Sequence, residues 1–227
     1  MKKISFLFAF LFLTIIGTAQ KSTDIGVFGG VGYYMGDVNI YKQFYSTNKA
    51  YGGVVRFNFN KRYSLKVSFI KSRLEGHDSD FANLYQQQRN HNFDISVTDF
   101  TSVVEFNFFD FSTQNPRYYI SPYLSAGMGL AITPDIKTKG SLVIPFALGM
   151  KFRINSRFST GFEWTFRKTF TDNLDNLDEQ LFSVEGNNIF ENKQKTVTLS
   201  NDWYSFAGVF LAFTLYERTQ RCRAYYN

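Results

Sequence analysis

Apolar and polar residues alternate along most of the chain with a period of two, which is the spacing of a β-strand with one apolar face. Phe162, Trp164 and Phe166, for example, alternate with Glu163 and Arg167. The same pattern recurs in eight segments and predicts a strand in each. The segments lie near 24–35, 51–59, 63–74, 93–108, 118–133, 142–154, 158–171 and 202–216.

The links between these segments differ in length. Those after the second, fourth and sixth strands, at 60–61, 110–117 and 155–157, are short, and the others are mostly longer, with the longest at 76–92 and 172–201. Outer-membrane barrels have short periplasmic turns and long external loops. An even number of strands then places both ends of the mature chain in the periplasm.

Composition favours a strand-built membrane protein. Aromatic residues make up 19% of the chain, yet its mean hydropathy is −0.22, as expected when each strand has one lipid-facing side and one polar side. After Ala19 no apolar run approaches the roughly 18–20 residues of a transmembrane helix. Because lipid cannot pair backbone groups, the sheet must close. We predict an all-β, eight-stranded antiparallel transmembrane β-barrel over 20–216, located in the outer membrane.

A soluble sandwich or a lipocalin-like barrel is the alternative, since both also alternate. Such a protein would turn its larger side chains inward and expose a charged face. Here the non-aromatic face carries Gly, Ser, Thr and a few charges, which suits the crowded lumen of an eight-stranded barrel.

Residues 1–19 have the features of a cleaved signal peptide. Lys2 and Lys3 precede an apolar stretch at 4–16, and a small residue stands at the expected cleavage site, Ala19. An uncleaved anchor is the alternative. No cysteine directly follows the stretch, so we expect no lipid attachment. Removal of the two lysines lowers the formal charge from +6 to +4; the basic residues are scattered, and we expect no nucleic-acid partner.

Several charged residues share the polar phase of the strands and are candidates for an ion-pair network in the lumen. They are Arg56, Lys66, Glu105, Lys151, Arg153, Glu163 and Arg167. If the sixth and seventh strands meet through 155–157, Lys151 faces Gly161 and Glu163 is its diagonal neighbour. A structural network filling the lumen is favoured over a path for protons or ions, because eight strands leave little room.

Two loops could carry chemistry. His77, Asp78 and Ser79 are consecutive, but consecutive side chains point apart, and the fold would have to bring the three groups together; His91 in the same loop adds little. An acidic group opens the 172–201 loop without the spacing or glycine of an EF-hand. Its members are Asp172, Asp175, Asp178 and Glu179. We therefore expect no enzyme, no cofactor and no metal site.

The single cysteine, Cys222, lies in the predicted periplasmic tail at 217–227. A leftover cysteine in an oxidising compartment suggests pairing with another chain. Arg221 and Arg223 flank it and favour the reactive thiolate. A disulfide with a partner and an incidental, capped or buried cysteine remain the two alternatives.

Five segments together resemble the PorG-like outer-membrane barrels of Bacteroidetes. They are YYMGDVN (33–39), VVEFNFFDF (103–111), SPYLSAGMGLA (121–131), LVIPFALGMKFRIN (142–155) and FSTGFEWTFRKTFTDNLDNL (158–177). The last is the most specific, because its Glu-Trp, Arg and Thr-Phe-Thr-Asp elements exceed what a barrel strand requires.

The resemblance implies a non-enzymatic component of the type IX secretion system. Its implied partners are outer-membrane lipid, a periplasmic ring-forming lipoprotein and the partner protein of that lipoprotein, during export of proteins with a C-terminal sorting domain. A small structural barrel of the OmpA type and a lipid-modifying enzyme at the rim are the alternatives.

Overall fold

The computed structural model describes most of the chain between Ser22 and Glu217. The described residues are 22–36, 38–39, 42–82, 86–87, 90–113, 119–134, 140–170, 174 and 202–217. The predicted signal peptide, Cys222 and the acidic group of the 172–201 loop lie outside them. No helix among the described residues is long and apolar enough to span a membrane.

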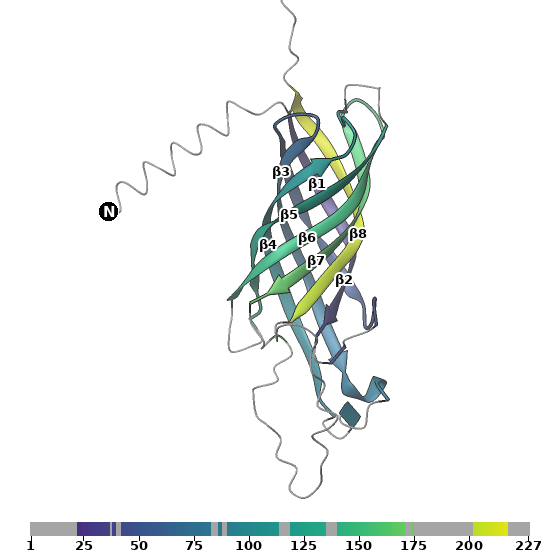
Figure 1. Ribbon diagram of the computed structural model, residues 1–227, viewed down its shortest axis with the longest axis vertical. Coiled ribbons are helices and arrows are strands. Elements are labelled where there is room, and N and C mark those ends of the chain that lie inside the picture. The colour runs from purple at the N-terminus through teal and green to yellow at the C-terminus, as the bar shows by residue number, and fades with distance from the viewer. Residues whose placement is uncertain are drawn as a thin grey trace, which may run out of the picture.

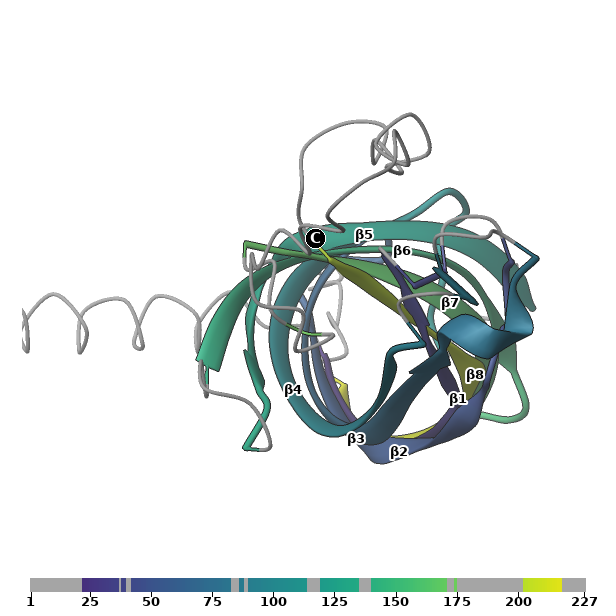
Figure 2. The ribbon, with the colours of Figure 1, turned by 90° about the horizontal axis from the view of Figure 1, so that it is seen from below.

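Eight strands form one closed antiparallel barrel (Figures 1 and 2), which confirms the predicted fold class. Each strand pairs with the next, and β8 pairs with β1 from Ser22–Glu217 to Met35–Trp203. The strands are β1 (Ser22–Met35), β2 (Asn48–Asn58), β3 (Tyr63–His77), β4 (Asn92–Asn107), β5 (Ile120–Ile132), β6 (Gly140–Arg153), β7 (Phe158–Thr169) and β8 (Trp203–Glu217).

The alternation read from the sequence becomes an apolar exterior and a polar interior. In β7, Phe162 points outward and is 46% exposed, whereas Glu163 points inward and is 4% exposed. The predicted register also occurs, since Lys151 of β6 pairs with Gly161 of β7. A short turn therefore fixed which residues are neighbours along these two strands.

Trp164 is on the outer face, as expected, but it is half-buried. Its Nε1 donates a hydrogen bond to the hydroxyl of Tyr33 over 2.9 Å, and the Phe44 ring stacks on it with centroids 5.8 Å apart. The small residues Ala207 and Ser205, which pair with Trp164 and Phe166 across the two strands, are themselves buried. A loop residue thus covers part of the outer wall.

Pro145 is accommodated at a break in a ladder. The β5–β6 pairing runs from Ile120–Phe152 to Ala126–Phe146 and resumes only at Gly129–Val143. A proline has no N–H to donate to a neighbouring strand, so it is tolerated where pairing is interrupted.

Both described ends of the chain lie at one rim, which we call the terminal rim; the opposite end is the loop rim (Figure 1). The links at the terminal rim include 108–119, which is longer than the 133–139 link at the loop rim. Thr113 in the longer link is buried at the barrel mouth, where its Oγ1 lies 3.2 Å from that of Thr214. The described part of this link therefore reaches the opening of the barrel at Thr113.

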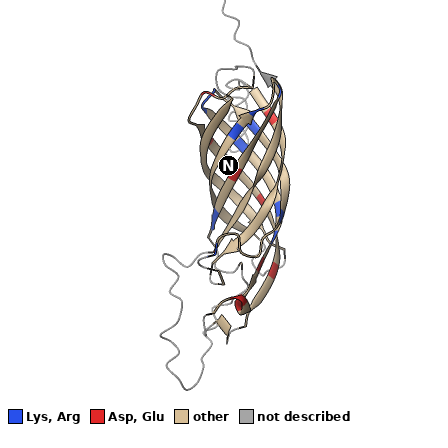
Figure 3. Cartoon of the chain, turned by 90° about the vertical axis from the view of Figure 1, so that its right-hand side faces the viewer, with Lys and Arg blue, Asp and Glu red and all other residues tan. Residues whose placement is uncertain are grey.

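The β3–β4 hairpin projects beyond the other strands at the loop rim (Figure 1). Its pairing continues to His77–Asn92, whereas β2 stops pairing with β3 at Tyr51–Lys71. Acidic residues lie on this projection (Figure 3). The barrel is therefore taller on one side.

The first prediction concerns the exterior. Phe162→Arg places a charge near the middle of the apolar wall and should weaken folding into bilayers by about 2–4 kcal/mol. Ile120→Arg is the control, because Ile120 is also on the outer face and 46% exposed but begins β5 beside the terminal rim, where the cost should be about 0–1 kcal/mol. Urea titrations of folding into lipid vesicles measure both. Equal stability of the two variants would contradict the assigned facing.

Candidate functional site

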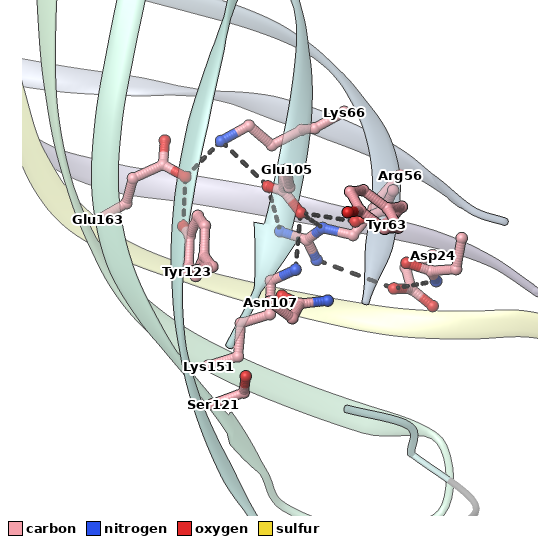
Figure 4. Close-up of polar contacts among 12 residues, drawn as sticks. Asp24, Arg56, Tyr63, Lys66, Glu105, Asn107, Ser121, Tyr123, Lys151 and Glu163 are labelled. Atoms are coloured by element: carbon pink, nitrogen blue, oxygen red, sulfur yellow. Dashed lines mark hydrogen bonds and ion pairs between the residues drawn. The ribbon is translucent and has the colours of Figure 1, made fainter. Parts of the chain in front are cut away.

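The lumen contains a cluster of charged side chains, here called the lumen cluster (Figure 4). It consists of three cations and three carboxylates, one from each of β1, β2, β3, β4, β6 and β7. Its members are Asp24, Arg56, Lys66, Glu105, Lys151 and Glu163, and all are buried. Opposite charges are thus equal in number, which a buried cluster requires because an unpaired charge is costly there.

Glu105 is the centre of the lumen cluster and is fully buried. Arg56 donates to it through Nε over 2.7 Å and through Nη2 over 3.3 Å. Lys151 Nζ donates over 2.6 Å, and Lys66 Nζ lies 3.4 Å from the second carboxylate oxygen. The hydroxyl of Ser64 adds a bond of 3.0 Å. One carboxylate therefore holds three cations from three other strands.

Lys66 links Glu105 to the second carboxylate, Glu163, with which it also forms an ion pair. Glu163 in turn accepts a hydrogen bond from the hydroxyl of Tyr123. The Tyr123 ring lies 4.7 Å from Lys151 Nζ, within the range of a cation–π contact. Aromatic faces therefore supplement the carboxylates around the cations.

Asp24 completes the cluster toward the terminal rim. Its carboxylate lies 3.8 Å from Arg56 Nη1 and accepts hydrogen bonds from Asn58 over 2.9 Å and Thr214 over 2.8 Å. These contacts connect the central cluster to the strand pair that closes the barrel, β1 and β8.

A second buried ion pair lies closer to the loop rim. Arg167 Nε donates to Asp99 Oδ2 over 2.8 Å, and the hydroxyl of Tyr204 donates to the same oxygen over 2.6 Å. Arg167 also contacts Thr165 Oγ1 and lies 4.4 Å from the centroid of the Phe206 ring. This pair is again balanced, one cation to one carboxylate.

The sequence placed most of these residues on the inner face. Arg56, Lys66, Glu105, Lys151 and Glu163 meet in the lumen cluster, and Arg167 is in the second pair. Lys151 does not bind its diagonal neighbour Glu163 but Glu105 of β4. The reason is that long inward side chains in a narrow barrel also reach strands that are not adjacent.

Arg153 is not part of the lumen cluster. It ends β6 at the terminal rim, half-buried, with its guanidinium 5.6 Å from the Tyr119 ring and Nε 3.4 Å from the backbone oxygen of Asn155. Arg153 is on the same inward-facing side of β6 as Lys151, but it lies two residues further along the strand, where the buried interior has ended.

Two buried carboxylates, Asp24 and Asp99, are not among the lumen residues predicted from the sequence. Both follow the inward alternation of their strands, Asp99 in step with Thr101 and Glu105. The signal was therefore present for Asp99. The glycine-rich pattern of β1 obscured it for Asp24, because glycines mark neither face.

Buried apolar side chains of two loops and of the β3–β4 hairpin contribute to a core at the loop rim. Val38, Leu74, Phe93 and Leu174 belong to the same buried apolar cluster. Polar groups tie the loops together, since Gln86 donates to the backbone oxygen of Val38 over 2.9 Å. The mouth is thus packed as a protein core.

Asp202 and Asp78 anchor this cap. Asp202 accepts hydrogen bonds from the hydroxyl of Tyr34 and from the backbone N–H of Leu174, the latter over 3.0 Å. Asp78 accepts one from the backbone N–H of His91 over 3.0 Å. Buried carboxylates of this kind hold loops by pairing their backbone donors.

The three side chains at 77–79 that could have formed a catalytic site do not converge. His77 Nδ1 lies 3.3 Å from Asn92 Oδ1, Asp78 is buried, and Ser79 is exposed. Nearby, the hydroxyl of Tyr45 donates a hydrogen bond to Asp80 over 2.6 Å. The pKa of Tyr45 is raised, mainly by burial and secondly by this hydrogen bond. Within the described residues, no three His, Cys, Asp or Glu side chains could together hold a metal ion.

A closed barrel with an apolar wall and a charge-paired interior defines the class: this is an eight-stranded outer-membrane β-barrel. The chain belongs to the family described as "Domain of unknown function (DUF6089)", whose model matches residues 2–224.

Known structures with similarity to the chain are small barrels. The N-terminal β-barrel domain of Pseudomonas aeruginosa OprF has 15% identity and a TM-score of 0.45, covering 86% of this chain and 98% of that one. Ail, the attachment invasion locus protein of Yersinia pestis, has 10% identity and a TM-score of 0.46, covering 86% and 99%. The outer membrane protein OprG from P. aeruginosa has 11% identity and a TM-score of 0.46, covering 86% of this chain and 97% of that one. No curated protein sequence matches the chain.

The second prediction concerns the central carboxylate. Glu105→Gln leaves three cations against two carboxylates and should destabilise the barrel by several kcal/mol, about 3–5 if no compensation occurs. Asp110→Asn is the matched control, because its ion pair with Arg62 is exposed and is worth about 0–1 kcal/mol. Urea unfolding followed by tryptophan fluorescence measures both.

The double variant Glu105→Gln/Lys151→Met restores the charge balance and should recover part of the lost stability. If Glu105→Gln were no less stable than Asp110→Asn, the cluster would not be the source of interior stability.

Proposed function

We propose that the protein is a non-enzymatic structural barrel with a filled lumen, which supports other molecules at its rims instead of passing solutes. The observation that carries this proposal is the arrangement of charge in the interior. The lumen cluster draws side chains from β1, β2, β3, β4, β6 and β7, so large ionised groups meet across the barrel where a channel would need water.

The size of the inward side chains supports the same proposal. Arg56, Lys151, Arg167, Tyr123 and Tyr204 are among the largest fully buried side chains of the described residues. An eight-stranded barrel is only wide enough for side chains to fill it. Folded segments additionally pack at both ends, around Thr113 and around Val38.

The third prediction is low conductance. The purified, refolded monomer in a planar bilayer should give no stable large channel, because the paired side chains exclude a continuous column of water. Arg56→Ala/Lys151→Ala removes two of them and should raise the frequency of channel events, with correct folding checked by heat-modifiable gel mobility. A large steady conductance from the unaltered protein would refute the filled lumen.

A secretion role is the second candidate. It rests on the resemblance to PorG-like barrels and on the charge of the terminal rim, which the topology of outer-membrane barrels directs to the periplasm. Four basic residues lie there, Lys61, Arg62, Arg153 and Arg157, with two acidic residues among those described, Asp110 and Glu217 at the end of β8. We propose that this basic face binds the ring-forming lipoprotein and its partner protein, and that Cys222 strengthens the contact by a disulfide.

The fourth prediction tests that attachment. Affinity purification from envelopes with thiols blocked at lysis should recover the ring proteins, and Arg153→Glu/Arg157→Glu should reduce recovery by repelling an acidic partner surface. Lys42→Glu/Lys49→Glu, a change of equal charge toward the loop rim, is the control.

In the same extracts, a non-reducing gel should show a larger species that collapses on reduction and is missing in Cys222→Ser. Recovery of the barrel without ring proteins would contradict the secretion role and leave only the structural one. A monomer alone under non-reducing conditions would contradict the disulfide.

A further inference from the structure

Three basic side chains lie together on the outer wall near the loop rim. Lys49 of β2 and Lys71 and Arg73 of β3 point outward and are exposed. The two strands are adjacent, with Tyr51 paired to Lys71, and the hydroxyl of Ser72 donates to the backbone oxygen of Lys49 over 3.1 Å. Side chains on the same face at such diagonal positions are within mutual reach. We call this group the basic triad.

The basic triad stands where the apolar wall ends. One step toward the middle of the barrel, the outward residues are aromatic: Tyr51 is 59% exposed, and Phe69 and Phe100 have ring centroids 4.8 Å apart. Aromatic girdles mark the membrane interface of such barrels. The cations are therefore at the level of the lipid headgroups, and the long loops on that side place them in the outer leaflet.

Two carboxylates on the same outer face, Asp94 and its cross-strand partner Glu75, compensate part of the charge of the basic triad. Arg73 pairs with Asp94 at 3.4 Å, but both side chains are exposed, by 65% and 46%, and such pairs are weak. Lys49 and Lys71 form no ion pair with any other described residue. Positive charge is thus available beside the membrane, in contrast to the balanced interior.

The wall next to the basic triad has uncovered backbone. A Cβ added at Gly29, which pairs with Tyr51, would meet no atom within 4 Å, and one at Gly53 would meet only a backbone oxygen at 3.9 Å. By contrast, a Cβ at Gly26 would be 3.0 Å from Ala212 Cα. Internal packing requires glycine at Gly26 but not at Gly29 or Gly53. The wall has no side chain at these two positions, so an acyl chain can approach the hydrogen-bonded backbone closely.

We propose that this face is a binding site for a phosphorylated glycolipid of the outer leaflet. Its phosphate groups bind Lys49, Lys71 and Arg73, and one acyl chain lies over Gly29 and Gly53 beside Tyr51. Lipid phosphate is the ligand because the cations are at headgroup level directly above an apolar wall, where a basic cluster attracts anionic headgroups.

The fifth prediction tests this site by native mass spectrometry of the folded barrel. A synthetic bisphosphorylated diglucosamine lipid should bind the unaltered protein, and Lys49→Gln/Lys71→Gln/Arg73→Gln should weaken binding about tenfold or more, because phosphate contacts are lost. Lys61→Gln/Arg153→Gln/Arg157→Gln removes equal charge from the terminal rim and should bind as the unaltered protein does.

A second variant tests the acyl contact without changing charge. Gly29→Val should fold normally, since its side chain meets open space, and should shorten retention of the bound lipid. The proposal is overturned if the basic-triad variant binds as the unaltered protein does, or if Gly29→Val retains the lipid for as long. It is equally overturned if phosphatidylglycerol or the dephosphorylated lipid binds as tightly as the bisphosphorylated one.

Discussion

Closure of the sheet between β1 and β8 is the constraint on which the rest of this structure depends. Lipid offers no partner for backbone N–H and C=O groups, so every strand edge must be paired by another strand. The ladder from Ser22–Glu217 to Met35–Trp203 supplies that last set of bonds. Once closed, the barrel has an exterior that must be apolar and an interior too narrow for bulk water.

The narrow interior explains the charge balance. An ionised side chain turned inward loses water and must find an opposite charge, and breaking a buried pair costs far more than the pair contributes. Glu105 meets this requirement for Arg56, Lys66 and Lys151, and Asp99 does so for Arg167. The same contacts join non-adjacent strands, so the interior network stabilises the closed form as well as filling it.

The exterior and the rims have a different role, because there charges remain in contact with water or headgroups. The basic residues at the terminal rim are exposed or half-buried, those of the basic triad near the loop rim are exposed, and both groups are only partly compensated. Charge that is balanced inside and unbalanced at the two membrane boundaries favours a barrel whose function lies at its surfaces. The projecting β3–β4 hairpin and the folded cap extend that surface at the loop rim.

The sequence by itself determined the strands, their facing and one register. Alternation such as Phe162–Glu163 is a local property, because neighbouring side chains on a strand point to opposite faces, and the short turn after Arg153 sets the pairing of Lys151 with Gly161. Only the tertiary structure decided that Lys151 binds Glu105 and that Asp99 binds Arg167. It also decided that Asp24 joins the lumen cluster, that Arg153 remains at the rim and that Phe44 covers Trp164. These contacts depend on strand tilt, stagger and loop folding in the closed barrel, which bring together residues whose separation along the chain carries no periodic signal.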